Sequence, residues 1–428
     1  MLTETPKRVP TPDTTNRVWP TYYAGYSAEF VRDAISNLGL ARGACVVDPW
    51  NGSGTTTSVA RARGIESYGY DINPAVVLMA KARLLGADVL PSVDPLGRAV
   101  VADAKKSLGP PLDVEPLERW FTPDSAVAFR QIETSIRRHL VPKHAGCLST
   151  ASSLIHVSTL AAFYYVSLFR ALRSFLTPFH GSNPTWVRSP ATHRHRLRPS
   201  FDDLAAAFVR ELAASKFLAT PEGNATPRKV STTIDVSDSA ALPLATESVD
   251  AVIASPPYCT RIDYAVATWP ELSLLGMTEP IFQKLRQRTI GSCLSPNVAP
   301  VKNADWGKTC RRLLAGIKRH PSHGSRTYYY RNHVAYFDSL HRSLEETWRI
   351  LKPSGKSVLV VQDSHYKELH TDLQQIVTEM MEGIGFQLQH RTDFHIPRTK
   401  AAVNTRSRLY RTSVHATEST LVFSCARS

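Results

Sequence analysis

The sequence is poor in cysteine and has no long apolar run, and each shortage excludes a class of protein. Its six cysteines are scattered over 428 residues without a C-x-x-C pair, so the sequence indicates neither a disulfide framework nor a zinc site. No segment approaches the roughly 20 apolar residues of a membrane span. The N-terminal M-L-T-E-T-P-K-R lacks the apolar core of a secretion signal. We therefore expect a cytoplasmic protein that binds neither metal nor membrane, with residues 1–18 as a flexible arm.

Acidic residues are outnumbered by basic ones, 37 to 51, which gives a net charge of +14 and an isoelectric point near 9.6. Such a charge favours a polyanionic partner. The basic residues gather in segments 180–200, 308–331 and 398–411, the first two of which also contain aromatic residues. Any one segment could be a solvated basic face, but three together favour nucleic acid. The candidate nucleic-acid contacts are Arg188, Arg194, Arg196, Arg261, Arg311, Arg312 and Arg326.

Short apolar runs alternate with helical patterns along much of the chain. This alternation predicts an α/β fold with a mostly parallel sheet covered on both faces. The predicted strands are 44–47, 67–70, 250–254, 356–361, 386–390 and 420–424; the predicted helices include 74–85, 336–351 and 369–381. Ligands bind such sheets beyond the carboxyl ends of the strands. Here those ends carry Asp48, Asp71, Ser255 and Gln362–Asp363, so we expect these residues on one rim.

Two segments interrupt the alternating pattern. Residues 105–230 are rich in helical signals and predict a mainly helical insertion. The insertion could read a target sequence, form a dimer face or dock a partner. Residues 278–333 are basic and irregular, and they predict a loop region that is the rival candidate for base reading.

A glycine-rich turn, D-P-W-N-G-S-G-T-T, follows the first predicted strand. Gly52 and Gly54 permit a tight turn and a close approach of ligand to backbone. A nicotinamide dinucleotide fold is the alternative, but Thr57 stands where its third glycine would be. Asp71 could accept hydrogen bonds from both ribose hydroxyls of a nucleoside, and Asp48 could orient the turn or meet an ammonium group. For both Asp48 and Asp71, the alternative is that the carboxylate only caps the loop in which it lies.

A second turn, S-P-P-Y, ends the predicted strand at 250–254. Pro256 and Pro257 donate no backbone hydrogen bond and must stop the strand. The residue before each proline is pushed into extended geometry. The result is a stiff turn that presents a hydroxyl, carbonyl groups and the ring of Tyr258. The turn has two possible interpretations. It is either a preorganised site for a flat molecule with an amino group or an ordinary proline-rich loop.

Together, D-P-W-N-G-S-G-T-T, Asp71, D-S-A-A-L-P-L, S-P-P-Y and L-K-P-S-G-K-S-V-L-V-V resemble the S-adenosylmethionine-dependent DNA amino-methyltransferases, and T-Y-Y-A-G-Y-S resembles their additional cofactor-side motif. The resemblance implies a Rossmann-like class I fold with a seven-stranded sheet, a catalytic domain over 19–104 and 231–428, S-adenosylmethionine as cofactor and double-stranded DNA as partner. It implies that the cofactor is bound by Tyr23, Asp48, Gly52, Gly54, Thr55, Asp71, Ile72, Asp238 and Ser239.

The resemblance also assigns roles in the S-P-P-Y turn. Ser255 and the carbonyl of Pro256 would accept hydrogen bonds from the exocyclic amino group, Pro257 would stiffen the turn, and Tyr258 would stack on a flipped base. Methyl transfer would be direct, with Cys259 incidental. The opening serine favours cytosine N4 over adenine N6. An RNA methyltransferase and a non-catalytic DNA-binding module remain alternatives, as do cognate restriction or defence partners; oligomeric state is open.

Overall fold

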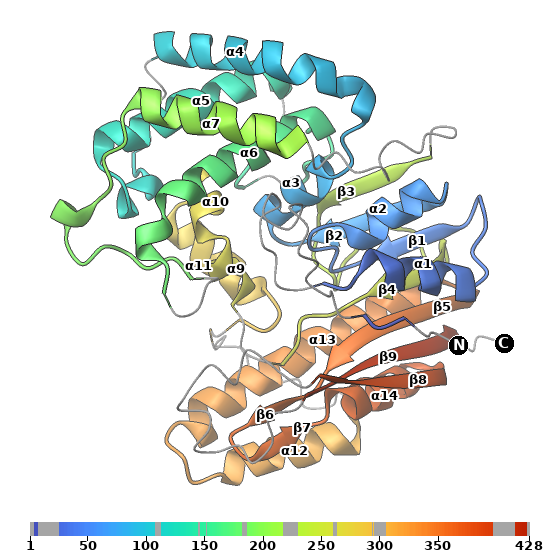
Figure 1. The fold of residues 1–428 in the computed structure, drawn as a ribbon. Helices are drawn as coiled ribbons and strands as arrows, with labels where there is room; N and C mark the ends of the chain where they lie inside the picture. The colour runs from blue at the N-terminus through green and yellow to red at the C-terminus, as the bar shows by residue number, and fades with distance from the viewer. Residues whose placement is uncertain are drawn as a thin grey trace.

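The computed structural model contains a sheet, helices on both of its faces and a separate helical layer (Figure 1). None of its described helices is long and apolar enough to span a membrane. The structure describes residues 4–6, 25–107, 113–143, 146–150, 152–181, 186–216, 230–259, 263–292, 294, 305–396 and 416–425.

The sheet has seven strands in the order β3-β2-β1-β4-β5-β9-β8. The first five are parallel, and β9 runs antiparallel to both of its neighbours. This confirms the Rossmann-like α/β fold. The strand order reverses between β1 and β4, and such a point opens a ligand crevice at the carboxyl ends. The strands are β1 Cys45–Asp48, β2 Glu66–Asp71, β3 Thr232–Val236, β4 Val249–Ala254, β5 Leu351–Gln362, β8 Phe386–Ile396 and β9 Ala416–Cys425.

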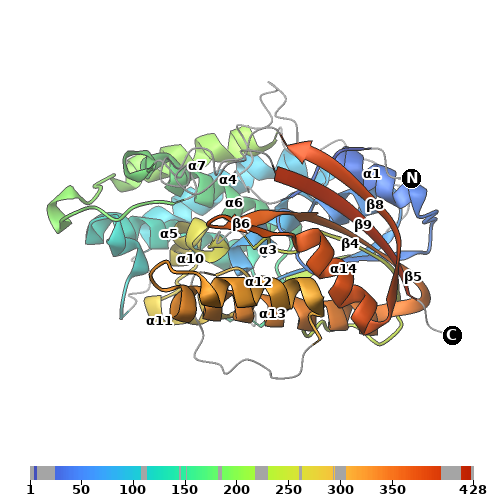
Figure 2. The same ribbon diagram turned by 90° about the horizontal axis from the view of Figure 1, so that it is seen from below.

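Alternate residues of the central strands face opposite helical layers. In β4, Ala251 and Ile253 pack in one apolar cluster, whereas Val252 and Ala254 pack in another. Helices α1 and α2 belong to the first cluster, and α12, α13 and α14 belong to the second. Figure 2 shows α12, α13 and α14 together on the side of the sheet away from α1. The apolar run of β4 is therefore that of a strand buried on both faces. These helices are α1 Ala28–Asn37, α2 Thr55–Ala62, α12 Gly307–Arg319, α13 Tyr330–Ile350 and α14 Leu373–Ile384.

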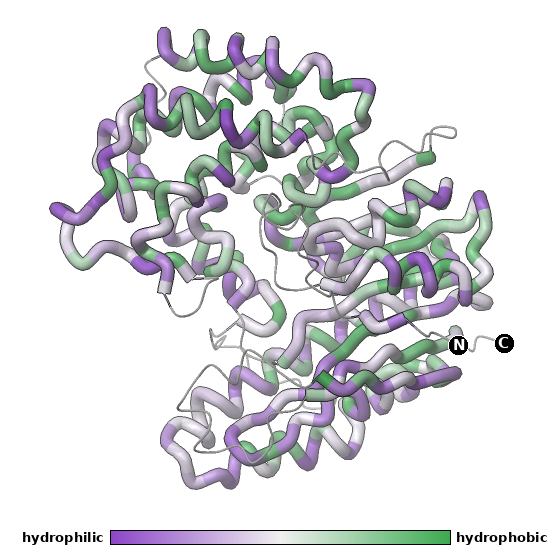
Figure 3. The backbone as a smooth tube through the Cα atoms, viewed as in Figure 1, coloured by the Kyte–Doolittle hydropathy of each residue, from purple (hydrophilic) through white to green (hydrophobic). Residues whose placement is uncertain are grey.

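The helical layer joins two segments that are far apart in the sequence. Within the described residues, four of its helices (α4–α7) lie between α3 (Pro74–Ala82) and β3, and three more (α9–α11) follow the S-P-P-Y turn. Apolar and polar turns alternate along these helices (Figure 3), and large aromatics such as Trp120, Tyr164 and Phe208 are fully buried. The helices of the layer are α4 Leu90–Lys106, α5 Pro123–Leu140, α6 Thr159–Phe175, α7 Phe201–Ser215, α9 Tyr264–Ala267, α10 Trp269–Leu274 and α11 Glu279–Arg288.

The helical layer starts earlier than the expected insertion, because α4 begins at Leu90 and packs on α5 and α7. The expectation of an irregular loop over 278–333 is wrong. That stretch contains α11 and α12, and α12 buries Cys310, Leu313, Leu314 and Ile317 at helical spacing among its basic residues.

The chain after β5 also differs from the sequence-based expectation. A helix was expected to begin at residue 369, but a two-stranded hairpin of β6 (Ser364–Tyr366) and β7 (Leu369–Thr371) comes first. Helix α14 begins only after Asp372, whose carboxylate accepts a hydrogen bond from the backbone N–H of Gln375. This N-cap fixes where the helix starts.

Candidate active site

The glycine-rich turn between β1 and α2 requires glycine for steric reasons. Gly52 and Gly54 have φ angles of 49° and 80°, a region that glycine occupies without cost. A Cβ atom on Gly54 would lie 2.9 Å from Cβ of Ala80 in α3. Opposite the turn, a Cβ atom on Gly69 of β2 would lie 2.4 Å from Cγ of Asn51. The turn is therefore packed directly against α3 and β2.

Asp71, at the end of β2, closes the turn from the other side. One carboxylate oxygen accepts from the backbone N–H of Gly52 at 3.3 Å, and the other accepts from that of Asn73 at 2.9 Å. Burial raises the pKa of Asp71 to about 6, against the lowering effect of these two bonds. The neighbouring candidate Ile72 is half-buried against the helical layer.

Asp48 is held at the end of β1 by a tyrosine that sequence reasoning missed. The Tyr26 hydroxyl lies 2.8 Å from a carboxylate oxygen of Asp48 and 3.0 Å from the carbonyl oxygen of Ile253. The other carboxylate oxygen accepts from the backbone N–H of Trp50 at 3.1 Å. Asp48 is 2% exposed, and burial raises its pKa to about 7. The candidate Tyr23, from the same motif, lies outside the described residues.

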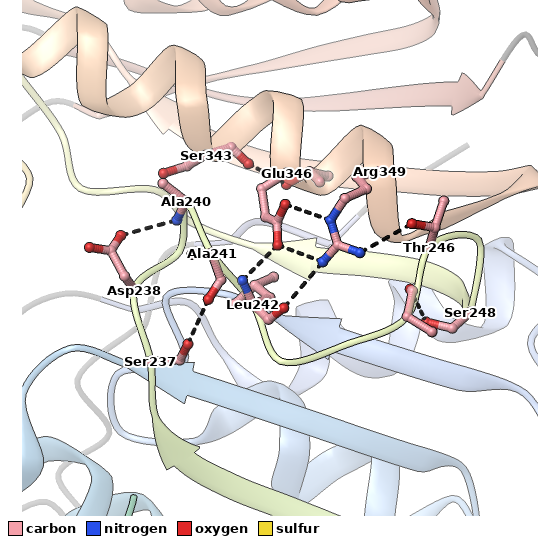
Figure 4. Close-up of polar contacts among 12 residues, drawn as sticks. Ser237, Asp238, Ala240, Ala241, Leu242, Thr246, Ser248, Ser343, Glu346 and Arg349 are labelled. Atoms are coloured by element: carbon pink, nitrogen blue, oxygen red, sulfur yellow. Dashed lines mark hydrogen bonds and ion pairs between the residues drawn. The ribbon is translucent and has the colours of Figure 1, made fainter. Parts of the chain in front are cut away.

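Other candidate cofactor residues have protein partners in the structure. Thr55 Oγ1 accepts from Arg83 at 3.3 Å. Asp238 accepts from the backbone N–H of Ala240 at 3.1 Å (Figure 4). It also pairs with Arg288 of α11 at 3.4 Å. The buried Ser239 hydroxyl lies 2.8 Å from that of Ser343 in α13. Cofactor contacts from these three side chains remain predictions.

The segment from Asp238 is fastened to α13 by further contacts. The backbone N–H of Leu242 donates to Glu346 at 2.6 Å, and its carbonyl accepts from Arg349 at 3.1 Å (Figure 4). Glu346 and Arg349 are themselves paired at 2.7 Å. The segment between β3 and β4 is thus fixed in place beside the expected cofactor site.

Hydrogen bonds to three different elements fix the S-P-P-Y turn. The Ser255 hydroxyl lies 3.0 Å from the carbonyl oxygen of Val360 in β5, and it can donate its hydrogen there. The carbonyl of Pro257 accepts from Tyr336 of α13 at 2.7 Å. The Tyr258 hydroxyl donates to Glu418 of β9 at 3.1 Å. Pro256 is buried. A turn held in this way cannot reorient freely.

The two turns emerge side by side. Strands β1 and β4 are hydrogen-bonded neighbours with Val47 opposite Val252, so the glycine-rich turn and the S-P-P-Y turn both leave at the strand-order reversal. Asn73 adds a second link, because its Nδ2 donates to Thr268 Oγ1 at 2.7 Å, just beyond the S-P-P-Y turn. Asp48, Asp71 and Ser255 therefore share one rim, as the sequence predicted.

The candidate nucleic-acid contacts fall into two groups. Arg188, Arg194 and Arg196 belong to the helical layer, where Arg196 pairs with Glu118 at 3.4 Å. The others lie on or beside α12: Arg311 pairs with Asp305 at 3.0 Å, and Arg312 and Arg326 are exposed. Arg261 lies outside the described residues.

No family model matches the chain. The type II methyltransferase M.BsoBI of Geobacillus stearothermophilus is 24% identical over 424 residues, which cover 86% of this chain and 78% of that protein. The type II methyltransferase M.AvaI of a Nostoc species is 28% identical over 151 residues, 33% of this chain and 31% of that protein. A solved structure assigned as a sarcosine dimethylglycine methyltransferase from Galdieria sulphuraria is 8% identical, covers 93% of this chain and 85% of its own, and has a TM-score of 0.30. This TM-score is too low to indicate a shared fold. The match to M.BsoBI covers most of the chain: over that length the chain is similar to type II methyltransferases.

Proposed function

We propose that the protein transfers a methyl group from S-adenosylmethionine to the exocyclic amino group of a base in DNA, with cytosine N4 as the preferred target. The observation that carries this proposal is the position of Ser255. Its hydroxyl stands at the end of β4, beside the glycine-rich turn that ends β1. An acceptor for an amino group and a turn suited to a nucleoside cofactor thus lie on the same rim of the sheet.

The residues around the glycine-rich turn fit S-adenosylmethionine. Asp71 would accept from the ribose hydroxyls, and Asp48 offers a negative charge for an ammonium group or orients the turn. Within the described part of the chain, the buried nitrogens of Trp50 and Asn51 have no hydrogen-bond partner, as expected of donors that meet a ligand. When bound, the cofactor supplies an electrophilic methyl group on a sulfonium.

The S-P-P-Y turn can make an exocyclic amino group nucleophilic. The lone pair of that nitrogen is delocalised into the base, and acceptors aimed at its N–H bonds favour the localised, pyramidal form. Because the Ser255 hydrogen can be donated to Val360, the lone pairs of its oxygen remain free to accept. The Pro256 carbonyl would supply the second acceptor. Tyr258, held at its hydroxyl by Glu418, would present its ring to a flipped base.

The first residue of the turn favours cytosine N4. Serine is a weaker acceptor than aspartate, and the S-P-P-Y form is more usual among the cytosine N4 enzymes that this sequence resembles. Adenine N6 is the alternative, with the same mechanism.

Two basic surfaces support DNA as the substrate. We define the basic face of α12 as the exposed Lys308, Arg311, Arg312, Lys318 and Arg319. Such a row of cations suits a phosphate backbone, which contributes affinity without sequence information. In the helical layer, Arg188 lines a surface hollow with Phe179, His180 and His195. Aromatic and basic side chains of this kind suit base reading, and we propose this layer as the target-recognition region.

The test is mass spectrometry of nucleosides from plasmid DNA incubated with purified protein and S-adenosylmethionine. We expect N4-methylcytosine with the wild-type protein and none with Ser255→Ala. Ser248→Ala is the matched control, because Ser248 also donates to a backbone carbonyl, that of Ala245 at 2.7 Å, but away from the site. N6-methyladenine would change the base and keep the mechanism. Cofactor binding without any modified base in DNA would overturn the proposal and direct the assay to RNA.

A further inference from the structure

Methyl transfer to an amino group leaves a proton to remove. As the bond from nitrogen to the methyl carbon forms, the bond from that carbon to sulfur breaks with its electron pair. The nitrogen then carries a positive charge, and one of its hydrogens must leave as a proton. A proline carbonyl cannot keep that proton. A serine hydroxyl can take it only if it gives up its own hydrogen at the same time.

The structure contains a hydrogen-bonded path that starts at the serine. Ser255 Oγ lies 3.3 Å from the hydroxyl oxygen of Tyr258, and that hydroxyl donates to Oε1 of Glu418 at 3.1 Å. The path joins two hydroxyls and ends on a carboxylate. Its first step requires the Ser255 hydrogen to turn from the Val360 carbonyl towards Tyr258, a rotation about a single bond.

Glu418 occupies an unusual position for an acid. It lies within β9, opposite Gln362 of β5 on one side and Phe394 of β8 on the other. It is 8% exposed, and acidic side chains are rarely so buried unless their environment gives them a role. Its contact to Tyr258 spans 160 positions of the sequence.

The state of Tyr258 suits a relay. Burial first, and then the nearby Glu418 carboxylate, hold the pKa of Tyr258 well above its ordinary value. Tyr258 therefore gives up its hydroxyl hydrogen only when a neighbouring hydroxyl donates another hydrogen to it. Such a residue can pass a proton on without ever being a free phenolate.

We propose that Glu418 is a positioning residue for the methyl transfer, which holds Tyr258 and receives the released proton through it. In the step, the base nitrogen gives its proton to Ser255, Ser255 gives its hydrogen to Tyr258, and Tyr258 gives its hydrogen to Glu418. Each hydroxyl ends with one hydrogen, as it began, and the Glu418 carboxylate becomes a carboxylic acid that later loses its proton to water. This inference rests on the proposed function.

The test compares Glu418→Gln with Glu418→Asp in single-turnover methylation at saturating DNA and cofactor. Glutamine keeps an oxygen that accepts from Tyr258 but cannot take a proton, whereas aspartate keeps the carboxylate. We expect Glu418→Gln to lower the transfer rate by about 100-fold, with unchanged cofactor affinity, and Glu418→Asp to recover part of the rate. Tyr258→Phe should lose as much, and the Glu418→Gln/Tyr258→Phe double variant no more than either single one.

Asp393→Asn is the matched control, because this acid of β8 contacts Ser419 of β9 at 2.6 Å but lies off the path. It should keep the wild-type rate. A wild-type rate in Glu418→Gln would overturn the relay, and so would an equal loss in Glu418→Gln and Glu418→Asp, which would indicate packing alone. Failure of the proposed function has a different signature: the wild-type protein itself would then methylate no DNA.

Discussion

The hydroxyl of Tyr26 donates to the carboxylate of Asp48 at 2.8 Å, and the same oxygen lies 3.0 Å from the carbonyl of Ile253. One side chain thereby joins the ends of β1 and β4. The charge beside the glycine-rich turn and the strand that carries Ser255 are thus held in a fixed relation.

Tyr26→Phe should weaken both folding and cofactor binding. The buried Asp48 would lose a donor, which costs about 1–3 kcal/mol, and its carboxylate could shift. Urea unfolding and calorimetric titration with S-adenosylmethionine measure the two effects. Tyr164→Phe is the control: this buried hydroxyl donates to Val93 at 2.5 Å within the helical layer. It should lose stability and keep affinity, and equal affinities in the two variants would contradict the role of Tyr26.

Gly54→Ala should abolish cofactor binding. The added methyl group would meet Ala80 at 2.9 Å, and the φ angle of 80° is strained for alanine. Gly43→Ala separates the two causes, because Gly43 has a φ angle of 89° with no atom within 4 Å of the added Cβ. We expect about 1–2 kcal/mol of destabilisation in the control and clearly more in Gly54→Ala. Thermal melting of both variants, with and without cofactor, measures stability and binding. Similar melting temperatures for Gly54→Ala and Gly43→Ala would refute the steric argument.

Cofactor affinity should rise with pH between about 5 and 8. Burial raises the pKa of Asp71 to about 6 and that of Asp48 to about 7. Because folding raises these two pKa values, protonation of the carboxyl groups stabilises the unliganded fold at low pH. This stabilisation is lost as the pH rises through 6–7. The proposed cofactor contacts of Asp48 and Asp71 require the charged carboxylates, so we expect cofactor binding to release protons in this range. Titration calorimetry in buffers of different ionisation enthalpy counts them, and Asp71→Asn should release fewer.

The buried ion pair between Arg173 of α6 and Glu271 of α10 should be important for stability. The two side chains lie 2.6 Å apart, and that of Glu271 is 2% exposed. Arg173→Ala leaves a buried charge, and we expect a loss of about 3–5 kcal/mol in the free energy of unfolding. Lys105→Ala is the control, because its pair with Asp202 is exposed and should contribute less than about 1 kcal/mol. Comparable losses would show that the α6–α10 contact is not critical.

The basic face of α12 should set the salt dependence of DNA binding. Each phosphate contact that is lost lowers the slope of log affinity against log salt by about 1. Arg312→Ala/Arg319→Ala should therefore flatten the slope by about 2, on any DNA sequence. Arg32→Ala, on α1 at the other face of the sheet, is the control. An unchanged slope in the double variant would place the DNA elsewhere.

The sequence predicted the parts of the fold whose signals are local. Apolar runs ending in Asp48, Asp71 or Ser255 identified three strands and the shared rim. Strand β3 was missed because only Ile234 and Asp235 of its five residues are buried, which leaves little periodicity. Helix α12 was missed because its apolar residues are spaced among arginines and lysines.

Contacts between distant segments could not be predicted in the same way. Tyr26 lay within a recognised motif, but nothing local distinguished it from Tyr23. Glu418 contacts the S-P-P-Y turn only because β9 pairs with β5, and this pairing depends on the complete sheet. Nothing local marked Glu418, because β9 also contains the polar residues Thr417, Ser419, Thr420 and Ser424.

The buried ion pairs of the helical layer also bear on how such proteins can diversify. Helices α4–α7 leave the sheet after α3 and return at β3, and these two elements touch each other, so this block could be exchanged without breaking the sheet. Helix α10 would have to follow, because Glu271 and the carbonyl of Ser273 are bound by Arg173 and Arg130 of that block. Two segments far apart in the sequence are thus bound together as one structural unit beside the sheet.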